Sequence, residues 1–174
     1  MTHFVVFALA LILGVPQDDI PDPTTPVVAQ VIVDAPTGAV WDAWTTRDLL
    51  LAWNEIGNSA MDLKIGGSWR TSYDPDSNLD DDTVIESTIL AFDPGRMLAT
   101  RTVRAPADFP FPNAILETWA VLYLEPVSDT QTRITTRMFG FTQDEESQGM
   151  REFFEWGNQY ELDKLAAYFA EDGP

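Results

Sequence analysis

The 174-residue chain contains no cysteine, and its one histidine is His3. Without thiols it can form no disulfide bond, no thiolate metal site and no cysteine nucleophile. A single histidine at the N-terminus also excludes a histidine-based catalytic triad or a multi-histidine metal site in the folded part of the chain. A glycine-rich phosphate loop and a nucleophile elbow are missing as well. We therefore expect a non-catalytic domain with no cofactor and no bound metal.

Positive charge is also scarce. Ten Lys and Arg residues stand against 28 Asp and Glu, which gives a formal net charge of −18 at pH 7. Nucleic-acid binding needs clustered basic residues that neutralise phosphates, so this acidic composition argues against a nucleic-acid partner. It argues equally against docking on an anionic membrane through a basic patch. The length fits one domain of ordinary size, and 45% hydrophobic residues are enough for a core.

Near the N-terminus, residues 4–15 form an unbroken apolar run. The run is shorter than the roughly 20 residues of a bilayer span, but it fits the apolar region of a secretory signal peptide. No Lys or Arg precedes it, and no small-x-small cleavage site follows it. We expect residues 1–15 to be a signal peptide or anchor of an exported protein, periplasmic or secreted, with no stable membrane span after processing. The alternatives are a buried strand or a misplaced start codon, and with a misplaced start the protein is cytoplasmic.

Residues 16–26 contain four prolines, which remove amide donors and favour an extended chain. We interpret this segment as a linker. The folded domain is expected to span 27–171, and residues 1–26 are expected to contribute nothing to its fold.

Turn signals divide the domain into strands and helices. We expect strands over 27–35, 60–65, 68–73, 83–92, 96–104, 115–125 and 131–139, with two short helices after the first strand and a long helix over 144–170. Short turns between successive strands indicate an antiparallel meander. Apolar residues cover more than half the circumference of the last helix, so a concave surface must enclose it. The prediction is an α+β fold in which a curved antiparallel sheet of about seven strands wraps around the C-terminal helix.

Four groups of residues occur in an order typical of one family. They are Val31–Pro36 with Val40–Thr45 and Leu49–Trp53; Asp62–Trp69; Ile89–Leu98 with Trp119–Pro126 and Thr132–Thr135; and Trp156–Leu165. With the order of elements, they resemble the START-like (SRPBCC) helix-grip superfamily, in the branch related to the C-terminal domain of the activator of heat-shock-protein-90 ATPase. The resemblance implies a cavity between sheet and helix. It implies no shared catalytic motif, because members include cochaperones, ligand binders and proteins of unknown role.

Aromatic residues are the candidates for the wall of that cavity. Phe153, Trp156 and Tyr160 share the apolar arc of the last helix and are expected to project onto the sheet, where Gly157 would leave room. The alternative is that the rings only fill the core. The expected ligand-binding residues are Trp53, Trp69, Trp119, Phe139, Phe153, Trp156 and Tyr160.

Charged residues offer weaker candidates. An inward Glu161 could have a raised pKa and act as an acid or base, or it could pair with Lys164 at the cavity rim. The loop 74–82 has oxygen ligands at every second residue, but Leu79 stands where a calcium loop needs glycine. Residues Glu86, Arg101, Glu117 and Arg137 could form a ladder on one sheet face, expected to be the solvated one.

The sequence therefore favours a non-catalytic, exported domain that binds a small hydrophobic molecule. A first alternative is a protein-interaction module, as the cochaperone relatives suggest, with an unknown protein partner. A second is a cavity enzyme of the cyclase or hydrolase type that uses Asp, Glu or Tyr. A solvent-connected cavity would favour the ligand, and a packed core with an exposed apolar patch would favour a protein partner.

Overall fold

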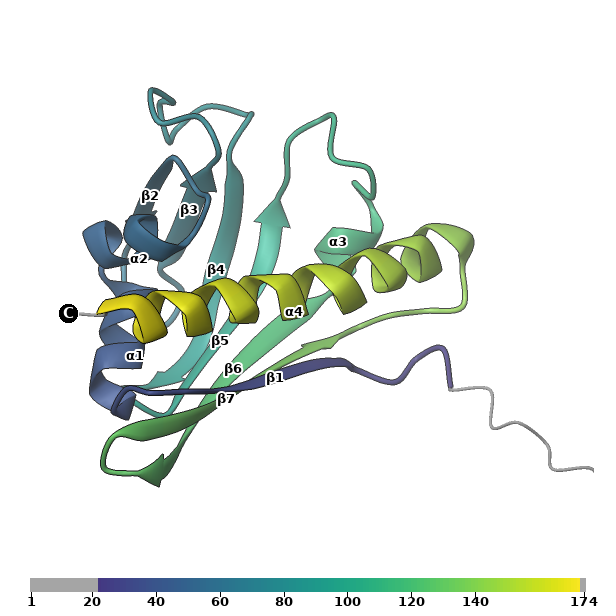
Figure 1. Ribbon diagram of the computed structural model, residues 1–174. Helices are drawn as coiled ribbons and strands as arrows, with labels where there is room; N and C mark the ends of the chain where they lie inside the picture. The colour runs from purple at the N-terminus through teal and green to yellow at the C-terminus, as the bar shows by residue number, and fades with distance from the viewer. Residues whose placement is uncertain (1–21, 173–174) are drawn as a thin grey trace, which may run out of the picture.

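The computed structural model describes residues 22–172, which form one seven-stranded antiparallel sheet with a long helix across its concave face (Figure 1). The strand order is β1-β7-β6-β5-β4-β3-β2. The strands are β1 (Val27–Val33), β2 (Asn58–Met61), β3 (Ser68–Ser72), β4 (Ile85–Asp93), β5 (Met97–Arg104), β6 (Trp119–Ser128) and β7 (Gln131–Phe139). The helices are α1 (Thr37–Thr45), α2 (Arg47–Trp53), α3 (Ala114–Glu117) and α4 (Glu145–Asp172). The predicted helix-grip fold is confirmed.

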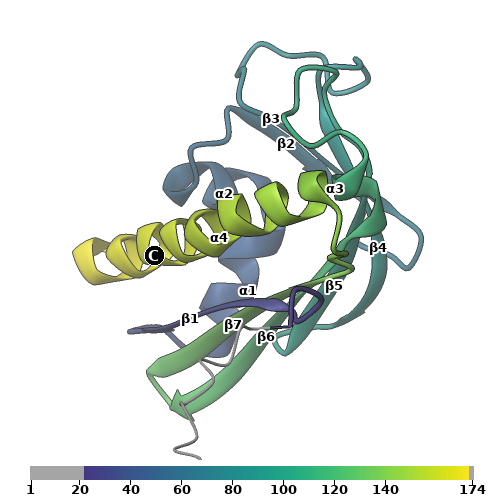
Figure 2. The ribbon, with the colours of Figure 1, turned by 90° about the vertical axis from the view of Figure 1, so that its right-hand side faces the viewer.

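The sheet curves so strongly that α4 lies inside it (Figure 2). Two register shifts interrupt the β4–β5 pairing, between Glu86 and Ser87 and between Ile89 and Ala91. Such bulges bend a strand and increase its twist, which turns β2 and β3 toward the helix. At the other edge α4 packs along β1, while α1 and α2 lie near its C-terminal end.

The N-terminus of α4 is fixed by local hydrogen bonds. The Asp144 side chain accepts a hydrogen bond from the Ser147 amide at 2.9 Å, and the Ser147 hydroxyl accepts one from the Thr142 amide at 2.9 Å. Hydrogen bonds from the Thr142 hydroxyl and the Ser147 amide lower the pKa of Asp144. Acidic residues in the first turn also complement the helix dipole. These hydrogen bonds fix the residue at which α4 begins, and so they help to set the direction in which the helix crosses the sheet.

Helix α3 occupies the first residues of a segment that was predicted to be a strand. We expected a strand over 115–125, but β6 begins at Trp119 and residues 114–117 are helical. The Glu146 carboxylate of α4 accepts hydrogen bonds from the amides of Asn113 and Ala114, at 2.8 and 3.0 Å, and so caps α3. These hydrogen bonds, Ala114's first, lower the pKa of Glu146. A cap from a distant helix cannot be deduced from local sequence.

The core has two separate clusters. The larger joins α1, α2 and the sheet to the C-terminal half of α4 through Leu162, Leu165 and Phe169. The smaller joins α3 and the strand ends to the N-terminal part of α4 through Met150. Between Met150 and Leu162 no residue of α4 is fully buried. The position of the middle of α4 over the sheet is therefore fixed by the packing of residues at the two ends of the helix.

The end of the proline-rich segment contacts α4. The Gln148 amide group donates a hydrogen bond to the Pro23 carbonyl oxygen at 3.1 Å, and Arg151 donates to the Thr25 carbonyl oxygen. Carbonyl groups of residues 23 and 25 thus contact α4, while the expectation that residues 1–26 contribute nothing to the fold stays a prediction. The expected signal peptide and most of the linker lie outside the described residues. Within 22–172, none of the helices combines the length and apolar character of a membrane span.

Candidate functional site

The face of α4 that looks at the sheet changes character along the helix. In the C-terminal half, Leu162 and Leu165 are completely buried. One to two turns earlier, the positions that line the space beneath the helix are Phe154, Asn158 and Glu161. A β-carbon built on Gly157 would meet no atom within 4 Å. These side chains do not fill the concave sheet, so a groove remains beneath the middle of α4.

An inner hollow of about 240 Å³ lies between the middle of α4 and strands β3, β4 and β5. Its floor carries Ser87 and Thr102, whose hydroxyl oxygens are 3.4 Å apart across β4 and β5. Its walls are mostly apolar, as suits a hydrophobic ligand. The apolar lining residues are Ile56, Trp69, Ile85, Ala105, Phe109, Ile115 and Phe154.

A deeper hollow of about 130 Å³ lies beside it, over strands β5, β6 and β7. Trp69 and Glu161 line both hollows, so the two spaces adjoin. Trp44 of α1 also lines the deep hollow and packs edge-on against Trp53 and Trp69, with ring centroids 5.0 and 6.5 Å away. The deep hollow thus has two tryptophan rings in its lining and a carboxyl group at its junction with the inner hollow.

Aromatic side chains surround the mouth of the groove. Two outer hollows, of about 360 and 410 Å³, share Tyr73, Phe153 and Phe154. Phe153 packs against Phe111 at 5.9 Å, which links α4 to the loop before α3. Trp156 stacks on Tyr160 at 4.9 Å, with 11° between the ring planes. The entrance offers flat apolar surface on both sides.

Polar contacts fix the far side of the mouth. The Tyr160 hydroxyl donates a hydrogen bond to Glu55 at 2.9 Å, and Lys164 pairs with the same carboxylate at 3.4 Å. The hydrogen bond from Tyr160 and then the charge of Lys164 lower the pKa of Glu55. The same hydrogen bond raises the pKa of Tyr160. Lys164 also lies 4.9 Å above the Tyr160 ring, so it is committed to this cluster.

Glu161 is the one carboxyl group among the residues that line the inner and deep hollows. It accepts a hydrogen bond from the Asn54 side chain at 2.7 Å. Burial raises the pKa of Glu161, and the Asn54 hydrogen bond and the Lys164 charge offset part of that rise. The predicted inward orientation of Glu161 is correct. The alternative pairing is wrong, because the ion pair of Lys164 is with Glu55.

The family profile described as "Activator of Hsp90 ATPase homolog 1-like protein" matches residues 34–170. The chain belongs to this family. The match begins just after β1 and ends in the last turns of α4, so it includes every element that lines the groove. No curated protein sequence matches the chain.

Solved structures share the Hsp90-activator-like fold. A Mesorhizobium loti protein is 20% identical, with a TM-score of 0.64 over 82% of this chain and 94% of the other. An Aha1 dimer from Colwellia psychrerythraea is 13% identical, with a TM-score of 0.62 over 83% and 95%. An Hsp90 activator from Plasmodium falciparum is 11% identical, with a TM-score of 0.60 over 84% and 96%. At these identities the likeness establishes the shared fold.

Four of the seven predicted ligand-binding residues line the groove of this family member. Trp69 forms part of its floor, and Phe153, Trp156 and Tyr160 form part of its mouth. The expected projection of Phe153, Trp156 and Tyr160 onto the sheet is wrong, because these residues are 45%, 65% and 39% exposed. Trp156 lies two residues, about 200° of helix rotation, from the inward Phe154. The broad apolar arc of α4 includes a rim as well as a buried face.

The other three residues lie elsewhere. Trp53 is buried in the larger core cluster, and its Nε1 donates a hydrogen bond to the Ala43 carbonyl oxygen at 2.9 Å. Trp119 and Phe139 stack at 5.5 Å, next to each other in β6 and β7. Ala120 lines the deep hollow, so its neighbour Trp119 points to the convex face. Strand phase therefore removes these two rings from the groove.

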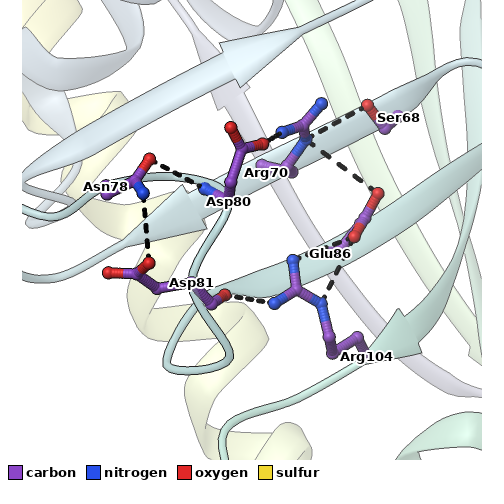
Figure 3. A network of polar contacts seen from close by, with 7 residues as sticks. All are labelled: Ser68, Arg70, Asn78, Asp80, Asp81, Glu86 and Arg104. Atoms are coloured by element: carbon purple, nitrogen blue, oxygen red, sulfur yellow. Dashed lines mark hydrogen bonds and ion pairs between the residues drawn. The ribbon is translucent and has the colours of Figure 1, made fainter.

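The convex face also carries the charged network of Figure 3. Arg104 pairs with Glu86 at 3.0 Å, while Arg70 pairs with Asp80 of the acidic loop. The Arg104 guanidinium also donates to the Asp81 carbonyl oxygen. The expected solvated face is thus correct for Glu86, with different partners from those predicted. Within residues 22–172 no group of three or more acidic or histidine side chains is placed to hold a metal ion.

Several groove residues were not predicted from the sequence. Phe154 and Asn158 follow Met150 at intervals of four, and this spacing could have revealed the inward face. Ser87 and Thr102 lie in strands where polar residues occur on both faces, so the sequence pattern did not indicate that their side chains point into the groove. Phe109 belongs to a proline-rich loop, in which its ring packs at 6.1 Å against Phe111.

Proposed function

We propose that the groove beneath the middle of α4 binds a small hydrophobic molecule. The observation that carries this proposal is the apolar inner hollow of about 240 Å³, which adjoins the aromatic mouth through Tyr73, Phe154 and Glu161. Ligand sites are typically concave and apolar, with a few polar groups that orient the ligand. The groove fits this description, and its mouth gives a ligand a path from solvent.

The interrupted inward face of α4 supports the same function. A helix that served only to close the sheet would continue its row of buried aliphatic residues from Leu165 back to Met150. Instead Gly157, Asn158 and Glu161 occupy the middle. Each of them costs stability relative to an aliphatic residue that filled the space, because interiors are otherwise closely packed. Ligand binding accounts for these three residues, because a bound molecule would occupy the space that aliphatic side chains leave empty.

A protein partner is the second candidate, and a different observation favours it. Trp156 and Tyr73 are 65% and 72% exposed at the mouth, and large exposed rings mark interaction surfaces. Two structural neighbours are described as Aha1 and as an Hsp90 activator. A cochaperone-like contact would use these outer rings and would leave the inner hollow unoccupied.

A matched pair of glycine substitutions separates the two functions. Gly157→Leu places a side chain in the open space beside the groove, whereas Gly38→Leu adds the same side chain to an exposed position of α1 where a β-carbon also meets nothing. The probe is N-phenyl-1-naphthylamine, an uncharged apolar fluorophore. We expect the wild type and Gly38→Leu to bind it saturably, with fluorescence enhancement.

Gly157→Leu should weaken probe binding by about tenfold or more, which corresponds to about 1.4 kcal/mol. Native mass spectrometry of the purified protein then shows whether a small molecule copurifies with the wild type. Equal probe binding by all three proteins, or no binding by the wild type, contradicts the proposal. Loss of binding in Trp156→Ala but not in Gly157→Leu would instead locate the contact on the outer rings, as the protein-partner function requires.

A further inference from the structure

Trp44 packs against the indole rings of Trp53 and Trp69, and the N–H groups of the three rings differ in one respect. Trp53 Nε1 donates to the Ala43 carbonyl oxygen at 2.9 Å, and Trp69 Nε1 donates to the Ser59 hydroxyl at 3.2 Å. Trp44 Nε1 is shielded from solvent and has no hydrogen-bond partner within residues 22–172. Trp44 is only 5% exposed and lines the deep hollow. Because buried indole N–H groups usually find an acceptor, this donor indicates a missing partner in the deep hollow.

A second polar atom in the same hollow points to the same conclusion. Thr136 of β7 lines it, and the Thr136 hydroxyl is buried without a partner among the described residues. On the same strand, the Thr132 hydroxyl donates to the Ala35 carbonyl oxygen at 2.7 Å. Glu161 completes the set, since its carboxyl group receives one hydrogen bond, from Asn54. Two unpartnered atoms and a carboxyl group thus meet one space of about 130 Å³.

We propose that the deep hollow receives the polar end of the groove ligand, and that this end is an uncharged oxygen, as in an alcohol or a ketone. Trp44 donates a hydrogen bond to that oxygen, and Thr136 and Glu161 exchange hydrogen bonds with it. The apolar body of the ligand lies in the inner hollow, which shares Trp69 and Glu161 with the deep one. This inference rests on the proposed function and specifies the chemical class of the ligand.

The charges around the hollow favour a neutral group. Arg137 is the one basic residue in its lining, but it alternates with the inward Thr136 and is exposed on the convex face, beside Tyr123 and Glu125. A carboxylate would therefore stand next to Glu161 without a counter-charge, in a protein of net charge −18. An ammonium group has no lone pair to accept the Trp44 hydrogen bond. A hydroxyl or a carbonyl oxygen is uncharged and has a lone pair that accepts the hydrogen bond from Trp44 Nε1.

Four compounds with one carbon skeleton test the inference: cyclohexylmethanol, methylcyclohexane, cyclohexanecarboxylate and cyclohexylmethylammonium. Titrations of the ¹⁵N-labelled protein would follow the indole N–H signals of its six tryptophans, with that of Trp44 assigned from Trp44→Phe. We expect the alcohol to bind about tenfold more tightly than the hydrocarbon, the gain of one net hydrogen bond, and more tightly than either ion. The Trp44 signal should shift downfield with the alcohol and much less with the hydrocarbon.

Two variants keep the test independent of folding. Thr136→Val preserves side-chain shape and should reduce the preference for the alcohol while leaving affinity for methylcyclohexane unchanged. Trp44→Phe should abolish most of the preference, and its folding is checked by the dispersion of its other indole signals. If neither variant changes the ratio of the two affinities, the assignment of the deep hollow is wrong.

The failure of the inference differs from the failure of the proposed function. If all four compounds bind equally well, or if an ion binds best, while the Trp44 signal does not move, the groove binds ligands but the deep hollow does not select a neutral oxygen. If none of the four shifts any signal from residues of the inner hollow, both the inference and the proposed function are overturned.

Discussion

The two halves of the long helix perform different tasks with similar compositions. From Leu162 onward, α4 presents aliphatic and aromatic side chains that are buried against α1, α2 and the sheet. From Phe153 to Glu161 it presents aromatic rings to the mouth, and to the interior it presents Phe154 and the polar side chains of Asn158 and Glu161. Both stretches are rich in apolar residues, yet only one of them is packed. The comparison shows that apolar content does not distinguish a core from a groove, whereas the identity of the inward positions does.

The largest expected effect is in the packed half. Leu165 is completely buried, so Leu165→Ala removes buried methyl groups and leaves a cavity. We expect the free energy of unfolding to fall by about 2–5 kcal/mol. Urea denaturation monitored by circular dichroism measures this change. A loss below about 1 kcal/mol would mean that the C-terminal half is as loosely packed as the middle.

Glu161 should make the stability of the middle depend on pH. Its pKa is raised in the folded state from the ordinary value of 4.5 by burial, so the folded protein binds this proton more tightly than the unfolded chain does. Its contribution to stability is therefore complete below pH 4.5 and is lost as the pH rises through the raised pKa. Glu161→Gln has no proton to lose, so its stability relative to the wild type should increase over this pH range.

Urea denaturation of both proteins at a series of pH values above and below 4.5 tests the sign of this effect. Glu152→Gln, on an exposed position of the same helix, corrects for the removal of one negative charge from an acidic protein. A stability difference that shrinks as the pH rises would show that Glu161 is stabilised as a carboxylate, contrary to its buried position.

Gly157→Leu should stabilise the protein while it narrows the mouth of the groove. Glycine inside a helix costs about 0.5–1 kcal/mol relative to better helix formers, and the new side chain meets no obstruction. We therefore expect a gain of about this size in the free energy of unfolding. A loss would indicate that the space beside Gly157 is closed in solution.

The smallest effect is expected at the rim. Trp156 is 65% exposed and its main contact is the Tyr160 ring, so Trp156→Ala should change the free energy of unfolding by about 0.5 kcal/mol or less. Thermal denaturation compared with the wild type measures this. A loss as large as that of Leu165→Ala would mean that the ring is buried and that the orientation of α4 is wrong.

Much of the fold followed from sequence pattern, because turn residues and strand alternation are local. The residues of the groove were predicted less well from the sequence than the fold was. Side chains alternate between the two faces of a sheet with a period of two, and this alternation places Trp69 on the concave face and Trp119 on the convex face. The sequence pattern did not show which of the two faces Trp119 occupies. The position of Phe154 rather than Trp156 on the inward face depends on how α4 is rotated. That rotation is set by the contacts of Met150 and Leu165 at its two ends, which are long-range.

The most direct test of the groove compares methyl groups from the two regions. Methyl NMR spectra of the protein, recorded during a titration with N-phenyl-1-naphthylamine, would report on Ile85 and Ile115 in the inner hollow and on Leu162 and Leu165 in the packed half. We predict saturable shifts of the two isoleucine methyl signals and unchanged leucine signals. Shifts confined to the leucine methyls, or no saturable shift at any of the four, would contradict the presence of a binding groove beneath the middle of α4.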